Sequence, residues 1–254
     1  MRSLVMSLFI LLCVGLVVNA YDKDTVAVWL MEEGAGNTIK DSTGNNHDGK
    51  LTGGKWVNGK FGKAIQFNGT SDFIEVAHDA ALDLQTYTII ATFMIPATPT
   101  GWYTIICKDT AGPTRNYGLY VGTTGLLNCS FSSDKAWQGI HDPAADKELN
   151  TRVDDGKWHV VAISYDMKMY RVFIDGKLEA EKSVTAKPDI GVMPVFIGSW
   201  AGGGWLNGMI DEVYLSKRGL TEADIVKFNN GTSLASAVSA KEKTAITWGQ
   251  VKSY

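Results

Sequence analysis

The chain has 254 residues, of which 45% are hydrophobic and 20% are charged, a balance typical of a globular protein. All-β domains often run to about 200 residues or more, so one domain is a better expectation than two small ones. The formal net charge of −3 and the scattered lysines and arginines argue against a nucleic-acid partner, because phosphate binding needs a clustered basic surface.

Residues 1–20 predict a secretory signal peptide. Met1-Arg2-Ser3 supplies a positive charge, residues 4–18 are apolar, and Val18-Asn19-Ala20 fits a small-residue cleavage site. The apolar run is short for a membrane span, and no second run of spanning length follows. We therefore expect a mature protein that starts at Tyr21, has no membrane span and is secreted or periplasmic. An uncleaved membrane anchor is the alternative.

The next part of the chain predicts short strands joined by polar loops. Residues 25–30 (TVAVWL) predict the first strand, and residues 41–49 a long polar loop. Further strands are predicted at residues 88–95, 103–107, 117–121 and 126–131. Residues 132–154 read as one long loop without a strand.

Residues 156–184 predict an antiparallel meander. They hold three runs rich in β-branched and aromatic residues, at 158–165, 170–174 and 178–184. Asp175-Gly176 separates the last two runs and suits a tight hairpin turn, in which both central residues need positive φ. Both alternating sets of the first run are largely apolar, so another layer must cover each face of that strand.

The chain after the meander predicts two strands and one helix. The strands lie at residues 195–198 and 209–215, with a glycine-rich link at 199–205 between them. A short helix follows Thr221, whose hydroxyl group can cap it, and residues 229–231 stop it. About a dozen strands, one helix and no long internal repeat predict a two-sheet jelly roll.

Two sets of motifs, in order along the chain, strongly resemble the LamG-like jelly-roll domains of the concanavalin A-like lectin/glucanase superfamily. The first set is W-x-x-E-E-G-x-G, D-S-x-G-N and G-K-x-G-x-A-x-x-F-x-G-x-x-D-x-I-x-V, and the second is W-H-x-V-A-x-x-Y-D followed by F-I-D-G-K. The resemblance covers residues 26–228. It implies an all-β, two-sheet antiparallel β-sandwich with one short C-terminal helix. We divide the chain into a signal peptide (1–20), a LamG-like domain (21–231) and a C-terminal tail (232–254).

The acid pattern of a glycoside hydrolase is missing. Glucanases of this superfamily carry E-x-D-x-E or E-x-D-x-x-E on one strand, and neither motif occurs here. Glu179-Ala180-Glu181 lacks a third acid and reads as the solvated face of an edge strand. We therefore expect a non-catalytic module that binds a glycan or a cell-surface or matrix partner. A divergent glycoside hydrolase or polysaccharide lyase, and a purely structural surface domain, are the alternatives.

The histidines and cysteines carry no metal or disulfide pattern. The four histidines show no H-x-x-x-H spacing, and His159 is expected to pack beside Trp158 and Val161. Cys107 and Cys129 fall on strands that a third strand separates, which places them about 9–10 Å apart. A disulfide bond requires a Cα separation below about 7 Å, so two buried thiols are favoured.

Calcium is the cofactor that the resemblance implies. In similar domains the aspartate that opens the last strand is a side-chain ligand, and carbonyl groups from a loop before an early strand complete the shell. The matching aspartate is Asp211, and the matching loop carbonyl lies at Asn68-Gly69. Glu32 and Asp41 are plausible further oxygen ligands, since calcium binds six to eight oxygens. The strand period places Asp211 on the inward row; hydrogen bonding to backbone amides or to a lysine is the alternative role.

Four tryptophans in or beside predicted loops are the candidate ligand-binding residues: Trp102, Trp137, Trp200 and Trp205. Flat rings exposed on loops can stack on sugar faces and form a recognition surface. Packing over the sheet edges is the alternative role for each of them. The expected partner is therefore a carbohydrate or a surface protein.

Overall fold

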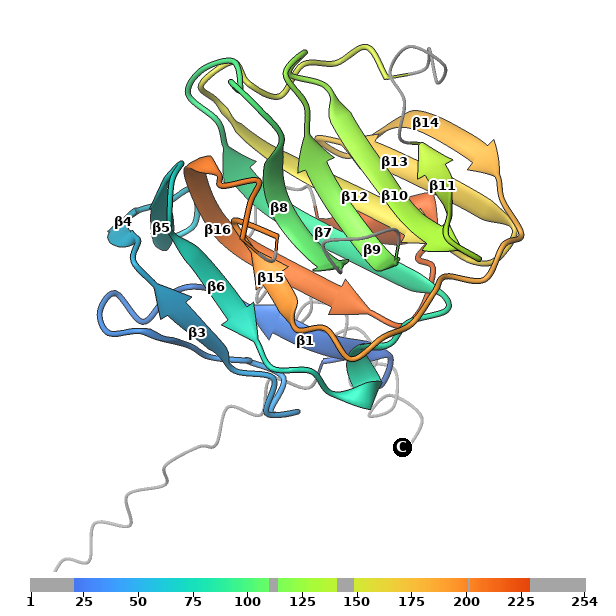
Figure 1. The fold of residues 1–254 in the computed structure, drawn as a ribbon, viewed down its shortest axis with the longest axis horizontal. Coiled ribbons are helices and arrows are strands. Elements are labelled where there is room, and N and C mark those ends of the chain that lie inside the picture. Colours follow the sequence, from blue (N-terminus) through green and yellow to red (C-terminus); the bar gives the residue numbers. More distant parts are fainter. Residues whose placement is uncertain (1–20, 110–113, 141–148, 201, 229–254) are drawn as a thin grey trace, which may run out of the picture.

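The structure is a computed structural model that describes residues 21–109, 114–140, 149–200 and 202–228. In it two antiparallel sheets of eight strands pack face to face (Figure 1). Sheet A contains β1 (Thr25–Trp29), β4 (Lys55–Asn58), β5 (Lys63–Asn68), β7 (Tyr87–Met94), β12 (Trp158–Tyr165), β13 (Met169–Ile174), β14 (Lys177–Ser183) and β16 (Asn207–Ser216). Sheet B contains β2 (Thr38–Ile39), β3 (Gly49–Thr52), β6 (Phe73–Val76), β8 (Tyr103–Asp109), β9 (Arg115–Val121), β10 (Leu127–Ser133), β11 (Ala136–Ile140) and β15 (Val195–Ile197). The predicted two-sheet sandwich is confirmed.

The strand order is that of a jelly roll in which distant segments lie side by side. Sheet A runs β14-β13-β12-β7-β16-β5-β4, with β1 also paired to β16, and sheet B runs β11-β10-β9-β8-β15-β6-β3-β2. The closing strand β16 therefore pairs with the first strand β1 and with β7, and β7 in turn pairs with β12 of the meander. Large side chains fill the space between the sheets, among them Trp29, Phe67, Phe93, Phe131 and Tyr165.

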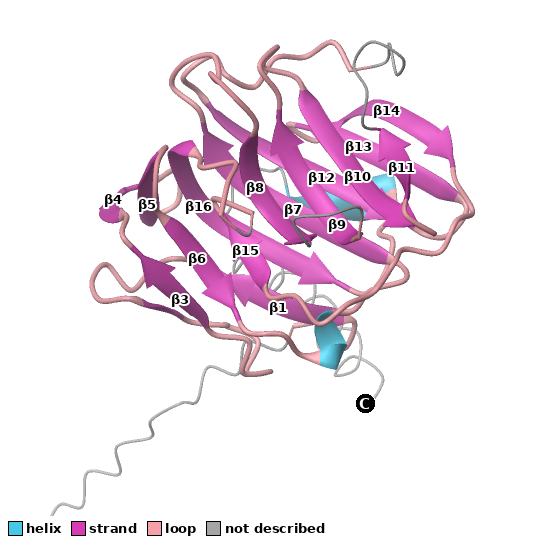
Figure 2. Cartoon of the chain, viewed as in Figure 1, coloured by secondary structure: helices cyan, strands magenta, loops and turns pink. Residues whose placement is uncertain are grey.

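The outer face of sheet A is covered by the only α-helix of the described residues, α1 (Glu222–Phe228) (Figure 2). Ile225 packs against Val160 and Ala162 of β12, which lie on the face opposite the main core. This confirms that both faces of β12 are covered. The predicted cap is also present, because the Asp224 N–H donates to Thr221 Oγ1 (3.3 Å). The predicted helix stop at residues 229–231 and the tail lie outside the described residues.

The meander is antiparallel and has the predicted turn. Strands β12, β13 and β14 pair in sequence, and Asp175 and Gly176 both have positive φ (50° and 77°). The prediction of one loop for residues 132–154 is wrong in part, because β11 forms there and pairs with β10. Its turn residues Asp134 and Lys135 adopt positive φ (48° and 65°) without a glycine, so the sequence carried no strong turn signal.

The two described cysteines are free, as predicted. Cys107 on β8 and Cys129 on β10 have β9 between them, and both are buried. Cys129 lies in the main core, whereas Cys107 lies in a separate cluster with Tyr120 and Phe196. Because the two side chains point to opposite faces of sheet B, their sulfur atoms lie farther apart than the strand spacing alone predicts.

His159 is buried at the start of β12, and both of its ring nitrogens contact carboxylates that the sequence did not predict as its partners. Its Nδ1 lies 2.8 Å from Asp175 Oδ2, and its Nε2 lies 3.0 Å from Asp155 Oδ1. The two carboxylates hold the ring between the start of β12 and the β13–β14 turn. The hydrogen bond to Asp175 is the largest influence that raises the pKa of His159. The pKa of Asp155 is lowered chiefly by its hydrogen bond with Lys157 and further by His159, and the His159 hydrogen bond lowers the pKa of Asp175 against the effect of burial.

We expect this arrangement to make stability depend on pH. A histidine with a raised pKa in the folded state contributes stability that is fully present below its unfolded pKa of about 6.5. That contribution disappears as the pH rises through the higher folded value. Urea unfolding of the wild type and of His159→Gln from pH 5.5 to 9 should therefore show a difference in free energy that shrinks with pH. In the Asp155→Asn/Asp175→Asn background, adding His159→Gln should change the free energy of unfolding by an amount that does not depend on pH. A difference between the wild type and His159→Gln that stays constant with pH would contradict this role.

Candidate functional site

An aromatic cluster lies on the outer face of sheet B, away from the main core. In β9, Tyr117, Leu119 and Val121 point into the core, whereas Tyr120 points to the opposite side. Tyr120 packs there with Cys107 of β8 and Phe196 of β15, and Phe73 and Trp200 lie against them. Three neighbouring strands therefore contribute to one surface, in the sheet that overlies the other in Figure 1.

Arg115, the first residue of β9, organises this surface. Its guanidinium carbon lies 4.2 Å from the centroid of the Tyr120 ring and 4.4 Å from that of Trp137. Arg115 Nε donates to Asp109 Oδ2 (2.8 Å), and Nη1 donates to Ser130 Oγ (2.6 Å). Two rings and two hydrogen bonds thus fix the plane of the guanidinium group, which has further N–H donors along its edge.

Asp109 is the buried partner of Arg115. Its side chain is only 6% exposed, and Oδ2 also accepts a hydrogen bond from Tyr120 OH (3.0 Å). Oδ1 is buried and has no hydrogen-bond partner among the described residues. Burial raises the pKa of Asp109, while the Arg115 charge opposes that rise. The carboxylate therefore depends on Arg115 for its charged form.

All four candidate tryptophans lie at this face of sheet B. Trp137 covers Arg115, and the Trp200 ring meets Tyr120 edge-on with 6.0 Å between centroids. Trp205 lies 5.8 Å from Phe73, which is 6.0 Å from Phe196. Trp102 lies over Gly122, directly after β9, where an added Cβ would approach its ring to 3.2 Å.

The four rings differ in how much solvent they meet. Trp102 and Trp137 are among the most exposed large apolar side chains, at 45% and 43%, whereas Trp200 and Trp205 are half-buried. Trp137 lies on β11, a strand that the sequence pattern does not predict. The polar centre of the face, Arg115 with Asp109, was missed as well. Both residues extend the predicted strands by two positions, and only the β8–β9 register makes them neighbours.

Asp211 lies at a bulge in the closing strand. Between the pairs Ile210–Phe93 and Val213–Ala91, two residues of β16 oppose one of β7. Ile210 and Val213 therefore both face the core, and Met209 is only half-buried. The expected inward row of Met209, Asp211 and Val213 is wrong, because the bulge resets the alternation.

The Asp211 carboxylate is fully buried beside the loop between β4 and β5. Oδ2 accepts a hydrogen bond from the Phe61 N–H (2.8 Å), and Oδ1 has no partner among the described residues. Burial raises the pKa of Asp211 to about 6, and the charge of Glu32 adds to the rise. Glu32 Oε1 accepts a hydrogen bond from the Lys63 N–H (3.1 Å) at the end of the same loop. Asp211 and Glu32 therefore flank one loop.

The other two predicted metal ligands are not brought to Asp211. Gly69 lies beside Asn207, four positions along β16 from Asp211, which corresponds to about 13 Å. Asp41 pairs with Trp29, the residue of β1 opposite Val213, and so lies two strand spacings from β16. Its Oδ1 accepts hydrogen bonds from the N–H groups of Val28 and Thr43, and its Oδ2 from that of His47.

Among the residues that the structure describes, no three His, Cys, Asp or Glu side chains converge as a metal site. The same residues contain no helix that is both long and apolar enough to cross a membrane. A cation beside Asp211 would therefore need backbone carbonyl groups or water for most of its ligands.

Known structures share this fold at low sequence identity. The binding domain of Paraclostridial Mosquitocidal Protein 1 superposes with a TM-score of 0.64 and 17% identity, covering 82% of this chain and 52% of that one. Domain 4 of AbnA, a GH43 extracellular arabinanase from Geobacillus stearothermophilus solved with arabinotriose, gives 0.62 and 18%, covering 82% and 98%. The binding domain of Botulinum Neurotoxin DC in complex with SialylT gives 0.62 and 14%, covering 84% and 52%.

The present chain spans about half the length of the two toxin binding domains and nearly all of the arabinanase domain. No curated protein sequence matches it significantly. The family described as the concanavalin A-like lectin/glucanases superfamily, Laminin_G_3, matches residues 68–226, more than half of the chain. This match agrees with the sandwich architecture and the sequence motifs. The chain belongs to the concanavalin A-like lectin/glucanase superfamily.

Proposed function

We propose that this chain is a non-catalytic carbohydrate-binding module and that its glycan lies on the outer face of sheet B. The observation that carries the proposal is the stack of Trp137, Arg115 and Tyr120, with Trp200 beside it. Aromatic rings offer flat apolar surface to the C–H faces of a sugar, while polar side chains between them serve its hydroxyl groups.

The polar groups of this face are held in place before any ligand arrives. Ser130 Oγ donates to Asn128 Oδ1 (2.9 Å) while it accepts from Arg115, so the polar row crosses from β9 to β10. A site that is already ordered loses less side-chain entropy when a ligand binds. This favours recognition over a purely structural role for the exposed Trp137 ring.

The structural neighbours support the class of ligand and not its identity. The arabinanase domain was solved with arabinotriose and the neurotoxin domain with SialylT. These two domains share 18% and 14% sequence identity with this chain, which is too low to infer the same ligand. The proposal therefore names no particular sugar.

A glycan array of the full chain tests the proposal. The wild type should bind a subset of glycans, and Trp137→Ala should weaken that binding about tenfold or more, as expected for an aromatic anchor. Leu178→Ala, which truncates an exposed apolar side chain on β14 of the other sheet, should change nothing. An array without binding, or equal binding by Trp137→Ala, would contradict the proposal. Product release from any bound glycan would instead favour a hydrolase or lyase.

We also propose a structural calcium ion beside Asp211. The residues fit a hard cation, since Asp211 Oδ1 is buried without a partner and Glu32 stands close enough to raise the pKa of Asp211. Asp211 and Glu32 would supply carboxylate oxygens, and because Gly59 and Gly62 lie against these two carboxylates, backbone carbonyls of this loop would complete the shell. The ion would neutralise the two acids and tie β16 to that loop.

Export through residues 1–20 belongs to the same proposal. A glycan-binding module with a calcium ion suits an extracellular or periplasmic setting, and the N-terminal pattern supports such a destination. Mass spectrometry of the exported protein should find Tyr21 at the N-terminus, and retention of residues 1–20 would contradict this part.

A further inference from the structure

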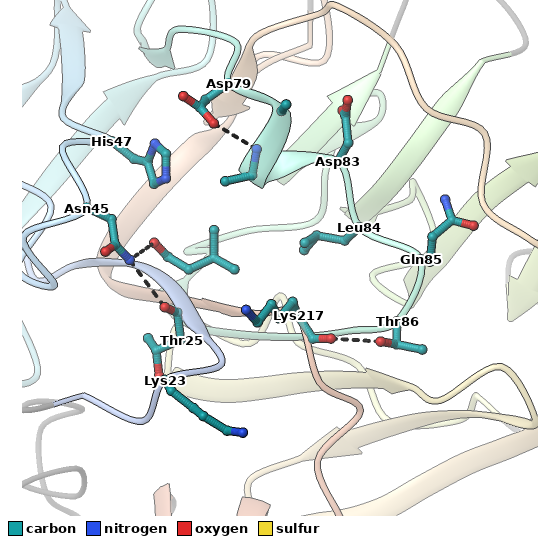
Figure 3. Close-up of a pocket in the computed structure, with 13 residues that line it drawn as sticks. Lys23, Thr25, Asn45, His47, Asp79, Asp83, Leu84, Gln85, Thr86 and Lys217 are labelled. Carbon is teal, nitrogen blue, oxygen red and sulfur yellow. Dashed lines mark hydrogen bonds between the residues drawn. The ribbon is translucent and has the colours of Figure 1, made fainter.

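A concave site separate from the aromatic face lies beside the start of β1, where loops between the two sheets meet. It is a cleft of about 580 Å³, within the size range of small-molecule sites (Figure 3). Its walls come from β1, the polar loop before β3, the short helix η1 (Ala80–Leu82) and the end of β16. None of its lining residues belongs to the aromatic face of sheet B.

His47 is the buried polar group of this cleft. Only 8% of the residue is exposed, and Figure 3 shows its ring directed into the open space. The backbone is fixed on both sides, because the His47 N–H donates to Asp41 Oδ2 (3.1 Å) and the His47 carbonyl accepts from Trp29 Nε1 (2.8 Å). The ring lines the open cleft, and neither of its nitrogens is a buried atom without a partner, so a ligand in the cleft can reach it.

Two lysines add positive charge at the mouth of the cleft. Figure 3 shows the Lys217 side chain reaching toward its centre, whereas the exposed Lys23 lies at its lower edge and its side chain points away from the cleft. The Lys217 backbone is held by a bond from its N–H to the Asp24 carbonyl (2.9 Å). Its ammonium group has only a long contact with Asp24 Oδ1 (3.9 Å), the outer limit of an ion pair.

The acidic and amide groups around the cleft are already engaged. Asp83 forms an ion pair with the buried Lys108 (Nζ–Oδ1 2.6 Å), and Asp79 Oδ1 accepts a hydrogen bond from the Ala81 N–H (2.7 Å). Asn45 Nδ2 donates to the Val26 carbonyl (2.9 Å). The donors left for a ligand are therefore the cations and the histidine.

We propose that this cleft binds a small molecule that carries a compact oxyanion, either a carboxylate or a phosphate. Lys217 and His47 would donate to the oxyanion, since charge-assisted hydrogen bonds are the strongest available here, and Lys23 would add positive charge at the edge of the cleft. Leu84 and Val26 line the remaining wall and would contact the apolar part of the ligand. The site is independent of glycan binding on sheet B.

Calorimetric titration of the full chain at low ionic strength tests the inference with three probes. Methyl glucuronide carries a carboxylate where the neutral methyl glucoside carries a hydroxymethyl group, so this pair tests the role of the anion. Inorganic phosphate tests an oxyanion without a sugar. Saturable binding of the glucuronide but not of phosphate identifies a sugar acid as the ligand class, and binding of phosphate identifies a phosphate-bearing one. Binding of neither anion, or equal binding of the neutral glucoside, overturns the proposal.

Substitutions locate the binding. Lys217→Met should weaken anion affinity about tenfold, equivalent to about 1.4 kcal/mol, and Lys23→Met should weaken it less. Lys227→Met removes an exposed lysine of α1 that is paired with Asp224, and should have no effect. In the wild type, the NMR signal of the Trp29 indole should shift with the anion, because this indole bonds to the His47 carbonyl. Wild-type affinity in the Lys23→Met/Lys217→Met double variant would overturn the site even if the sheet B face binds glycans.

Discussion

Chelation of calcium should lower the melting temperature of the protein by about 5–10 °C, and excess calcium should restore it. A cation at about a hundred times its Kd that binds only the folded state adds about 2.7 kcal/mol. A domain of this size gains about 2–4 °C per kcal/mol. The ion would remove the repulsion between Asp211 and Glu32 and satisfy the buried Asp211 Oδ1. Differential scanning calorimetry with EGTA and then calcium measures the shift.

Controls separate the ion from general salt effects. Magnesium should restore less than calcium, because it demands a tighter octahedral shell. Asp211→Asn should abolish the calcium response, whereas Asp41→Asn, whose carboxylate bonds to backbone amides, should cost stability and keep the response. If neither the chelator nor calcium changes the melting temperature of the wild type, Asp211 is a buried acid that binds no metal.

The calcium response should also depend on pH. In the metal-free protein the pKa of Asp211 is raised to about 6, so its contribution to stability is fully present below its unfolded pKa and is lost as the pH rises through 6. Calcium requires the ionised carboxylate and competes with the proton. The shift in melting temperature should therefore be larger at pH 7.5 than at pH 5. The opposite order would contradict a role for Asp211 as a ligand.

Replacing Arg115 by methionine should destabilise the protein by about 3–5 kcal/mol, because it leaves the Asp109 carboxylate buried without its counter-ion. The melting temperature should fall by on the order of 10 °C. Since burial already raises the pKa of Asp109, loss of the Arg115 charge should raise it further. The loss of stability in Arg115→Met should be largest at neutral pH. It should be smaller at low pH, where Asp109 is protonated in both the folded and the unfolded protein.

The double variant Arg115→Met/Asp109→Asn is the matched control for this effect. It should recover much of the lost stability, because it removes the uncompensated charge, but it should not recover glycan binding. Arg115→Lys should keep much of the stability and bind weakly, since an ammonium group cannot stack between Tyr120 and Trp137 and also hold Asp109 and Ser130. Equal stability of Arg115→Met and the wild type would contradict the burial argument.

Most of the sandwich follows from short apolar runs bounded by turn residues. The run at residues 158–165 forms β12 with the predicted bounds. Because this run is apolar on both faces, it is stable only where other layers cover both faces of the strand. Asp175-Gly176 gave the hairpin because it accepts positive φ. Strand β11 was not predicted, because its turn has no glycine. Pairing with β10 holds Asp134 and Lys135 at positive φ instead.

The candidate sites were less predictable because they depend on register. Trp137 and Trp200 could be selected as loop aromatics, but nothing in the sequence places Arg115 beside Asp109. The bulge at Asp211 is equally hidden, since the pattern around it reads as a regular strand, and only pairing with β7 reveals two residues opposite one. The cleft at His47 needs the ends of both sheets, which no local pattern describes.

The most direct test of glycan binding on sheet B is an NMR titration of the indole N–H signals with a glycan found on the array. The signals of Trp137 and Trp200 should shift with a common Kd, because both rings border the Arg115–Tyr120 centre. The signals of Trp29 and Trp56, bonded to the carbonyl groups of His47 and Gly36, should stay in place. Saturable shifts at Trp29 or Trp56 with none at Trp137 and Trp200 would contradict the account.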